Sequence, residues 1–507
     1  MGIEKIKSGT SVYFIGIKGT GVCALAELMH NSGMEISGSD TGETFYTDAI
    51  LKELNIPYHE NFDAAHIGAN INIVIHSAAY SADSNPELAR ALELNIPVMK
   101  YTDALGAWSA RFDSAGVCGV HGKTTTTAIC GVCARAAKLP AQILAGSAIF
   151  DFNGRSTLSL GDKYFIAETC EYRKHFLSFH PKRIILTSVE SDHQDFFPDY
   201  ESIRDAFVEY CRLLPEGGTL IYCADDSGAS EVAHIIEKEK RGIEFIPYGF
   251  TALGDYKVTD YKVENERAVF TLEGFSGEFK MRIPGRHEAL NAAAAIALTV
   301  SLAKKEFGTV QGSAALGEEK IQTIKNALEN FKSTKRRSEI IGEAGGIVFM
   351  DDYGHHPTAI KTTLSGIKSF YPSRRLIVSF MSHTYTRTSA LLEQFASAFN
   401  DADILFLHKI YASARENYNG GLDGRTLYEK TASVRSGETR YVDEPDDAFQ
   451  PLCEILKSGD LFITFGAGNN WTLGKKLYEH FNLINKFADK SINDKSINKS
   501  IATGRLS

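Results

Sequence analysis

Ser114-Ala-Gly-Val-Cys-Gly-Val-His-Gly-Lys-Thr-Thr-Thr-Thr127 carries the strongest signal in this chain of 507 residues. Its apolar start predicts a strand, and its threonine-rich end opens a predicted helix. Glycines at such a junction let backbone N–H groups approach phosphate oxygens, and the helix dipole favours the anion. The usual phosphate loop has about four residues between its glycines, whereas two residues separate Gly119 from Gly122. We therefore predict a variant phosphate loop. The alternative is a helix start that merely reads Gly-Lys-Thr.

Side chains in and after this loop fit a Mg²⁺–ATP site. Lys123 is placed to reach the β and γ phosphates, and the Thr124 hydroxyl is placed to ligate Mg²⁺. Two clusters, Glu168-Thr-Cys-Glu171 and Glu190-Ser-Asp-His193, follow apolar strands predicted at 164–167 and 183–187. Ligands of open α/β sheets bind at the carboxyl ends of strands, so both clusters are predicted near the loop. Taken alone, either cluster is equally well an ordinary loop carboxylate.

A second glycine loop lies near the N-terminus. Gly16-Ile-Lys-Gly-Thr-Gly21 follows a predicted strand at 11–15 and precedes a predicted helix at 22–31. Its spacing departs from the dinucleotide fingerprint G-x-G-x-x-G, which weakens an NAD interpretation. Asp40 lies 24 residues after Gly16, near the position of a ribose-binding acid. A diphosphate loop would serve a UDP-sugar equally well, and a tight strand–helix turn is the structural alternative.

Two polar loops follow apolar strands in the C-terminal third, where strands are predicted at 347–350, 376–380, 404–407 and 461–465. They are Asp351-Asp-Tyr-Gly-His-His-Pro357 and Ser382-His-Thr-Tyr-Thr-Arg-Thr388. The adjacent His355 and His356 are suited to binding a metal or an anion, although such a pair is more often a hydrogen-bonded loop feature. Two such loops at strand ends favour a site.

Alternating strands and helices predict parallel sheets with crossover helices, and the pattern restarts twice. We predict an α/β fold of three domains: a Rossmann-like domain at 1–107, a P-loop-type ATPase domain with a mixed sheet at 108–337, and a second Rossmann-like domain at 338–484. Residues 255–283 alternate in the manner of an antiparallel meander. The tail at 485–507 is poor in apolar residues and is predicted to be disordered.

Composition narrows the function. The chain is 43% hydrophobic and 23% charged, which excludes a mainly disordered or fibrous protein. A net charge of −9 gives no support to nucleic-acid binding. No apolar run reaches the roughly 18 residues of a membrane helix, so no membrane partner is expected. The eight cysteines are scattered, which favours a reducing cytoplasm over a disulfide framework. Cys130 and Cys133 share a predicted helix and are interpreted as packing residues.

Taken together, these motifs resemble the Mur ligases, the ATP-dependent amide-forming enzymes of peptidoglycan synthesis. The matching segments run in the family's order over about residues 10–480 and are Gly16–Gly21, His121-Gly-Lys-Thr-Thr-Thr126, Asp192-His193, Pro284-Gly-Arg-His287 with Asn291, Lys335-Arg-Arg337, Asp351–Pro357, His383–Thr388 and Gly466-Ala-Gly468. The combination is specific, although no single segment is.

The resemblance implies a function for each domain: the first binds UDP, the second binds ATP and the third helps to hold the amino acid. It implies that ATP phosphorylates the lactyl carboxylate of UDP-N-acetylmuramic acid, and that the amine of L-alanine then attacks the acyl phosphate. It further implies that the last domain closes over the ATP site, and that the enzyme is a monomer or homodimer.

The resemblance also assigns roles to residues. Catalytic roles fall on Lys123, Glu168, His193 and Arg337. ATP contacts fall on Gly119, His121, Gly122, Lys123, Thr124, Thr125, Asn291, Arg337 and Asp352, and metal ligation on Thr124, Glu168, Glu171 and His193. UDP-sugar contacts fall on Gly16, Lys18, Gly19, Thr20, Gly21, Ser39 and Asp40, and the acceptor side on His355, His356, His383 and Arg387.

Four positions depart from the family pattern. Glu288 replaces an Asn on the adenine side, and Cys170 replaces an acid between Glu168 and Glu171. Lys18 replaces a Gly of the first loop, and Asn469 replaces an Asp after the last Gly-Ala-Gly. Three alternatives stay open: a ligase that attaches a preformed tripeptide to the same UDP-sugar, an NAD-dependent oxidoreductase and a non-catalytic nucleotide-sugar sensor.

Overall fold

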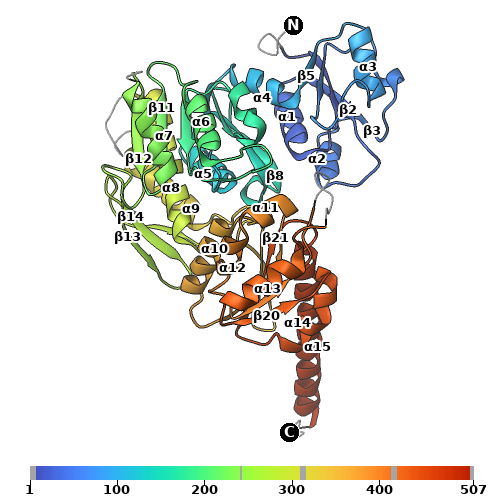
Figure 1. Ribbon diagram of the computed structural model, residues 1–507, viewed down its shortest axis with the longest axis vertical. Helices are drawn as coiled ribbons and strands as arrows, with labels where there is room; N and C mark the ends of the chain where they lie inside the picture. Colours follow the sequence, from blue (N-terminus) through green and yellow to red (C-terminus); the bar gives the residue numbers. More distant parts are fainter. Residues whose placement is uncertain (1–6, 240–241, 309–315, 413–419, 503–507) are drawn as a thin grey trace, which may run out of the picture. The chain divides into compact units, whose positions relative to one another are not determined.

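The computed structural model describes residues 7–239, 242–308, 316–412 and 420–502, with side chains as far as residue 486. The chain forms two compact units (Figure 1). The first contains residues up to 282 and 287–334, and the second contains 283–286 and the residues from 335 onward.

The first sheet of unit 1 is fully parallel. Its order is β3-β2-β1-β4-β5. The strands are β1 (Ser11–Ile15), β2 (Glu35–Ser39), β3 (Tyr58–His59), β4 (Ile73–His76) and β5 (Val98–Lys100). The connecting helices are α1 (Thr20–Asn31), α2 (Thr47–Glu53), the 3-10 helix η2 (Ala64–His66) and α3 (Pro86–Glu93), and α4 (Tyr101–Ser109) follows β5. The predicted Rossmann-like arrangement is confirmed.

The second sheet has the order β12-β11-β10-β6-β9-β7-β8. It is parallel except for β8, which pairs antiparallel with β7, so the predicted mixed sheet is confirmed. The strands are β6 (Asp113–Cys118), β7 (Ala141–Ile149), β8 (Arg155–Ser159), β9 (Tyr164–Glu168), β10 (Arg183–Leu186), β11 (Thr219–Cys223) and β12 (Glu244–Tyr248). The helices are α5 (Lys123–Ala136), η3 (Phe150–Phe152), η4 (Tyr172–Ser178), α6 (Tyr200–Cys211), α7 (Ser227–Lys238), α8 (Arg286–Phe307) and α9 (Gly317–Glu329). The central strands are buried along their length, as expected for a sheet with helices on both faces.

The meander predicted at 255–283 is also confirmed. Strands β13 (Val258–Val263), β14 (Ala268–Leu272) and β15 (Phe279–Met281) form a three-stranded antiparallel sheet.

Unit 2 contains a six-stranded sheet of order β16-β17-β21-β18-β19-β20. Five strands run parallel, but β16 pairs antiparallel with β17 across the turn at Gly345–Gly346, a strand that the sequence analysis did not foresee. The strands are β16 (Glu339–Ala344), β17 (Ile347–Asp352), β18 (Arg375–Met381), β19 (Ile404–Leu407), β20 (Glu438–Tyr441) and β21 (Asp460–Gly466). The helices are α10 (Pro357–Phe370), α11 (Tyr385–Ala390), α12 (Leu392–Ser397), α13 (Gly424–Val434), η7 (Pro445–Ala448), α14 (Phe449–Ile455) and α15 (Trp471–Ala502).

Helix α15 enters the segment for which the sequence predicts disorder. Its backbone is helical to Ala502, whereas residues 503–507 of the predicted tail lie outside the described residues. Residues 475–503 contain no glycine or proline, so no strong helix breaker interrupts the helical backbone.

The three-domain α/β architecture is that of the prediction, while the exact boundaries stay predictions. The predicted boundary at 107 falls inside α4, and the predicted boundary at 337 lies three residues beyond the end of the first unit at Thr334.

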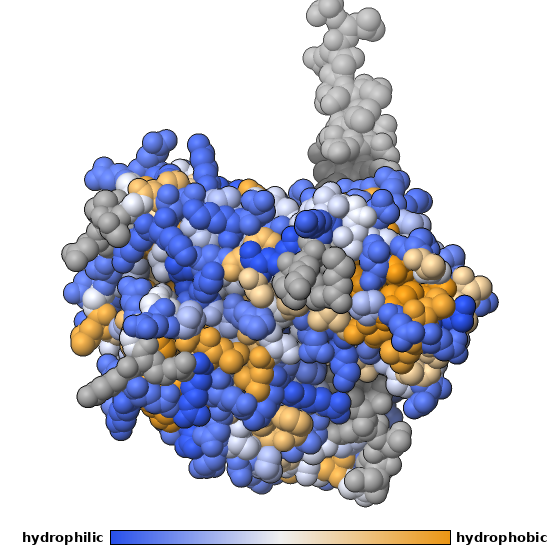
Figure 2. Space-filling view, turned by 90° about the horizontal axis from the view of Figure 1, so that it is seen from above, coloured by the Kyte–Doolittle hydropathy of each residue, from blue (hydrophilic) through white to orange (hydrophobic). Residues whose placement is uncertain are grey.

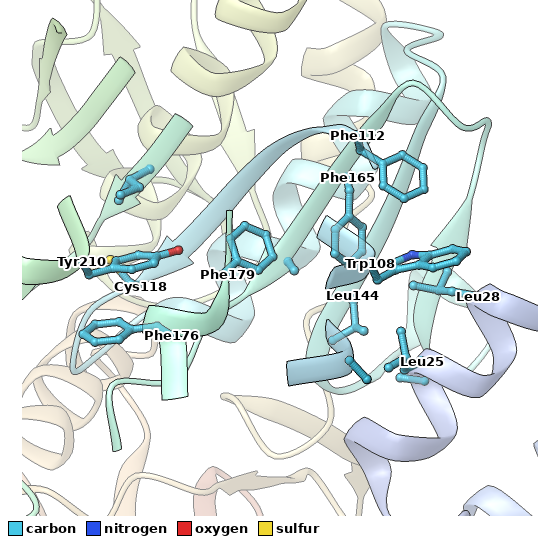
Figure 3. Close-up of a cluster of buried hydrophobic side chains, with 14 of the residues drawn as sticks. Leu25, Leu28, Trp108, Phe112, Cys118, Leu144, Phe165, Phe176, Phe179 and Tyr210 are labelled. Carbon is cyan, nitrogen blue, oxygen red and sulfur yellow. The ribbon is translucent and has the colours of Figure 1, made fainter. Parts of the chain in front are cut away.

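A single buried apolar cluster joins α1 and α4 to the second sheet within unit 1. Leu25 and Leu28 of α1 lie beside Trp108 of α4 and Leu144 of β7 (Figure 3). Burying a large apolar side chain stabilises a fold by about 1.5–3 kcal/mol. The cluster therefore fixes the helix that follows the first glycine loop against the sheet that carries the phosphate loop.

The face in Figure 2 is largely hydrophilic, with separate apolar patches. Scattered apolar side chains are normal on protein surfaces. Among the residues that the structure describes, no helix is both long and apolar enough to cross a membrane.

Candidate active site

The predicted phosphate loop connects β6, a central strand, to α5. Gly119 has φ = 133°, and a Cβ there would lie 2.1 Å from the Thr187 hydroxyl oxygen. Gly122 has φ = 78°, and a Cβ there would lie 2.8 Å from Asn291 Oδ1. Both positions combine a left-handed backbone with a close neighbour, so the loop requires glycine at each.

Lys123 directly follows Gly122 and is the first residue of α5. Its ammonium group donates to the carbonyl of Gly119 and lies 3.0 Å from Glu171 Oε2. Burial lowers the pKa of Lys123, but the Glu171 carboxylate raises it, and the net shift is upward. The side chain therefore keeps its positive charge beside the predicted phosphate loop.

Glu171 lies between Lys123 and His193 in one polar cluster. His193 Nε2 lies 3.4 Å from Glu171 Oε1. Burial raises the pKa of Glu171, but Lys123 and His193 lower it, so the carboxylate stays ionised. Three residues from different strand ends, predicted from sequence to lie together, are thus in contact.

Glu168 stands at the end of β9, in the same strand-end region. Its carboxylate accepts a 2.7 Å hydrogen bond from the backbone N–H of Gly146. A Cβ at Gly146 would lie 2.5 Å from Glu168 Oε2, so a side chain there would displace the carboxylate. The first turn of α5 buries Thr124 and Thr125, and within the described residues no group bonds the Thr124 hydroxyl.

Asn291 of α8 lies beside the phosphate loop. Its Oδ1 accepts a 3.1 Å hydrogen bond from the Thr126 hydroxyl, and its amide group donates to Glu288 Oε2 at 3.1 Å. Glu288, one of the departures from the family pattern, is buried, and its hydrogen bond orients the Asn291 side chain. On the other side of the loop, His121 pairs with Glu190.

The first glycine loop has the geometry of an anion site, with the N-terminus of α1 at Gly19 and Thr20. Gly16 has φ = 81°, and a Cβ there would lie 2.8 Å from the Tyr80 ring. Gly21 packs against Tyr101.

Lys18 does not point its charge into this loop. The side chain is 1% exposed, and its ammonium group donates to the carbonyls of Thr41 and Glu43 and lies 3.1 Å from Asp48 Oδ1. Burial lowers the pKa of Lys18, but Asp48 and Glu60 raise it, and the net shift is upward. The lysine that replaces a family glycine thus stabilises the 41–48 segment. Its backbone is engaged there as well, because the carbonyl of Lys18 accepts a 2.6 Å hydrogen bond from the Thr47 hydroxyl.

Asp40 and Ser39 are also engaged inside the protein. Asp40 accepts hydrogen bonds from the backbone N–H groups of Lys18 and Thr41, at 2.7 and 2.8 Å. The Ser39 hydroxyl donates to the buried Glu87. Both side chains hold the loop in shape, and their predicted contact with a UDP-sugar stays a prediction.

In unit 2, three of the predicted acceptor residues lie together. The rings of His355 and His383 are 5.3 Å apart, and Arg387 donates to His383 Nδ1 at 3.1 Å. His355 Nδ1 donates to the carbonyl of Tyr353 at 2.8 Å. His356 is instead buried at the start of α10, where it caps the helix through Thr358 N–H.

Arg337 and Asp352 belong to unit 2, so their predicted contact with ATP stays a prediction. The Arg337 guanidinium lies 5.5 Å from the centre of the Tyr353 ring. Asp352 accepts hydrogen bonds from the backbone N–H groups of Ser338 and Gly354, at 2.7 and 2.6 Å. The aspartate therefore shapes its own loop.

Sequence reasoning missed several residues around the phosphate loop. Thr187 donates to the carbonyls of Cys118 and His121, and Ser188 accepts from His121 N–H at 2.9 Å. Both directly follow β10, so the strand-end rule used for Glu168 would have found them. Gly146 carries no comparable signal, because it lies inside β7.

The strand–loop–helix unit around Lys123 and the parallel sheets define an α/β protein whose loop has the geometry typical of phosphate-binding loops. Comparison with known proteins gives the family. Residues 11–113 match the Mur ligase family catalytic domain, 117–299 the Mur ligase middle domain, and 336–468 the Mur ligase glutamate ligase domain.

Relatives match over nearly the whole chain. A UDP-N-acetylmuramate–L-alanine ligase of Treponema pallidum (strain Nichols) is 47% identical over 479 residues, which cover 94% of this chain and 98% of the relative. A protein of the same name from Borreliella burgdorferi is 37% identical over 91% of this chain and 97% of the relative. The chain belongs to the Mur ligase family.

Solved structures agree on the fold. A UDP-N-acetylmuramate–alanine ligase from Thermotoga maritima superimposes with a TM-score of 0.72 at 23% identity, covering 93% of this chain and 99% of that one. A murein peptide ligase from Psychrobacter arcticus gives a TM-score of 0.60 at 21% identity, covering 94% and 99%. At these identities, the two structures support the fold alone.

Proposed function

We propose that this protein is the ATP-dependent ligase that joins L-alanine to the lactyl carboxylate of UDP-N-acetylmuramic acid in peptidoglycan synthesis. The relatives from Treponema and Borreliella, which it matches along almost their full length, are named for this reaction. The observation that carries the chemical part of the proposal is the cluster of Lys123, Glu171 and His193 at the phosphate loop.

The chemistry follows from the poor electrophilicity of a carboxylate at neutral pH. A carboxylate oxygen attacks the γ-phosphorus of ATP, ADP leaves, and an acyl phosphate forms. The amine of L-alanine then attacks the acyl carbon, and the tetrahedral intermediate expels inorganic phosphate to leave an amide. Such transfers depend mainly on positioning and charge neutralisation. The charged Lys123 and the N-terminus of α5 supply both at the γ-phosphate.

The donor set beside the loop fits Mg²⁺, which prefers oxygen ligands. The carboxylates of Glu168 and Glu171 and the unbonded hydroxyl of Thr124 are oxygen donors in one strand-end region, and we assign them to the ion together with His193. When bound, Mg²⁺ would offset negative charge on the phosphates.

This assignment has its own test, with Glu168→Gln as the variant. Gln keeps an acceptor for the Gly146 N–H but removes the charge. We expect the Mg²⁺ concentration for half-maximal rate to rise by at least about 10-fold. An unchanged Mg²⁺ requirement would remove Glu168 from the ligand set.

The acceptor side is assigned to two histidines of unit 2. His355 donates from Nδ1 to the Tyr353 carbonyl, and we assign its imidazole, a group suited to proton transfer, to the amine of the incoming amino acid. Arg387 donates to Nδ1 of His383, and we assign this pair to the carboxylate of the amino acid, because a guanidinium binds carboxylates well. We expect the enzyme to act in the cytoplasm, as a monomer or homodimer.

The test is phosphate release from Mg²⁺–ATP and UDP-N-acetylmuramic acid with either L-alanine or a murein tripeptide as acceptor. The proposal predicts release that depends on L-alanine. Release with the tripeptide alone would instead assign the chain to peptide recycling. Release with neither acceptor, from a folded protein that binds ATP, would contradict the ligase assignment.

A further inference from the structure

One tyrosine hydroxyl lies against the first glycine loop and is not used by the proposed reaction. Tyr101 is the first residue of α4. A Cβ placed on Gly21 would lie 2.7 Å from its hydroxyl oxygen, so the hydroxyl lies directly against the last glycine of the first loop. Burial raises the pKa of Tyr101 most, and the negative charge of Glu168 raises it further, which places that carboxylate near the phenol. Tyr101 therefore lies near both the predicted UDP-sugar loop and Glu168, one of the residues that we assign to Mg²⁺.

Helix α4 is held tightly in this position. Gly106 packs on η4, which directly follows Glu171, and a Cβ there would lie 2.0 Å from the Ser178 carbonyl oxygen. The Ser178 hydroxyl donates to Asp103 at 3.1 Å, and Trp108 is fully buried in the apolar cluster (Figure 3). The hydroxyl of Tyr101 is therefore carried by a fixed element rather than by a free loop.

The hydroxyl of Tyr101 can donate a hydrogen bond to a ligand. Within the part of the chain that the structure describes, no group accepts from it or donates to it. An ordinary phenol keeps its proton at neutral pH, so the hydroxyl can donate a hydrogen bond. Tyr101 is only half-buried, and its hydroxyl is not among the fully buried polar atoms, so a ligand acceptor can reach it.

We propose that Tyr101 is a specificity-determining residue that donates a hydrogen bond to the lactyl carboxylate of the UDP-sugar. The inference rests on the proposed function. In that function the diphosphate occupies the first loop and the reacting carboxylate must reach the phosphoryl group beside Glu168. A substrate that spans these two points passes the Tyr101 hydroxyl. Tyr101 thereby selects a sugar that carries the lactyl acid.

The experiment compares two ligands that differ only in the lactyl group: UDP-N-acetylmuramic acid and UDP-N-acetylglucosamine. Binding of each to the full-length protein is measured by calorimetry for wild type and Tyr101→Phe. Removing a bond to a charged group predicts about 10-fold weaker binding of UDP-N-acetylmuramic acid. Binding of UDP-N-acetylglucosamine and ATP should change less than about twofold, because neither presents that carboxylate to Tyr101.

Tyr200→Phe is the matched control. It removes the same atom from a hydroxyl that already has a protein acceptor, the exposed Glu231 on α7, and should alter neither UDP-sugar affinity. In turnover, Tyr101→Phe should raise the KM for the UDP-sugar while leaving the KM for ATP unchanged.

Two results would overturn the inference. Equal weakening of both UDP-sugars would assign the hydroxyl to the shared UDP portion, and no weakening of either would remove it from the site. Failure of the wild-type protein to bind UDP-N-acetylmuramic acid would instead count against the proposed function. If Tyr101→Phe does not fold, a crystal structure of wild type with UDP-N-acetylmuramic acid decides. A lactyl oxygen at about 2.5–2.7 Å from the hydroxyl supports the inference, and one beyond about 3.5 Å contradicts it.

Discussion

At the scale of single residues, the Lys123–Glu171 pair combines a chemical and a structural role. The Lys123 side chain is 14% exposed and that of Glu171 only 2% exposed, so removing one partner leaves the other charge buried. Lys123→Met should reduce phosphate release by about 10²–10³-fold, because the charge facing the γ-phosphate is lost. It should also destabilise the fold by about 3–5 kcal/mol, as expected for a broken buried pair.

The structural part of this prediction is checked by chemical denaturation of a double variant. Lys123→Met combined with Glu171→Gln removes both charges and should be more stable than Lys123→Met alone. Activity should stay low in both. A double variant as unstable as the sum of the single variants would show that the two side chains are not coupled.

His408 gives a pH prediction in unit 2. It lies fully buried, its Nδ1 donates to the Val442 carbonyl at 2.8 Å, and its Nε2 lies 2.8 Å from the Ser379 hydroxyl oxygen. Burial lowers the pKa of His408 from 6.5 to about 4. The unfolded chain therefore binds more protons between these values. The contribution of His408 to the free energy of unfolding is complete above pH 6.5. It is lost as the pH falls towards 4, by about 3 kcal/mol in all.

Denaturant unfolding of His408→Gln should show a weaker rise in stability between pH 4 and 6.5 than wild type. His234→Gln is the control, because His234 is an exposed side chain of α7 and should leave the slope unchanged. An identical slope in wild type and His408→Gln would show that His408 titrates normally in the folded protein.

At the scale of elements, α4 connects the first loop to the turn that carries Glu171. Gly106→Ala would place a Cβ 2.0 Å from the Ser178 carbonyl oxygen. This oxygen belongs to the backbone of η4, which cannot move away as easily as the end of a flexible side chain. Overpacking of this kind costs about 1–3 kcal/mol or more. We expect a lower thermal unfolding midpoint and weaker binding of the UDP-sugar.

Gly42→Ala is the matched control for this element. A Cβ at Gly42 would meet only the Glu60 carbonyl oxygen, at 3.9 Å, which is ordinary contact. Its unfolding midpoint should stay close to wild type. If Gly106→Ala behaved like Gly42→Ala, the tight docking of α4 on η4 would be contradicted.

The sequence predicted elements better than it predicted their edges. Apolar runs such as Ile347–Met350 and Leu376–Phe380 located β17 and β18 because buried parallel strands are continuous in hydrophobicity. Strand β16 was missed because most of its residues are only half-buried or exposed at a sheet edge, so its apolar pattern is weak.

At the scale of the whole molecule, the sequence predicted those parts of the site in which residues with suitable side chains directly follow a predicted strand. Glycines, lysine and carboxylates at strand ends identified Lys123, Glu171 and His193 as neighbours, and the structure brings them together. Side-chain direction was not predictable. The loop position of Lys18 suggested an anion contact, yet its charge is neutralised inside the protein by Asp48, a residue 30 positions away.

Activation of the carboxylate through an acyl phosphate is followed with UDP-N-acetylmuramic acid that carries ¹⁸O at both oxygens of its lactyl carboxylate. Turnover with ATP, Mg²⁺ and L-alanine transfers one carboxylate oxygen to phosphorus, and mass spectrometry of the released phosphate detects it. The account predicts one ¹⁸O atom in each phosphate and one retained in the amide. Phosphate free of ¹⁸O, formed while amide accumulates, would contradict it.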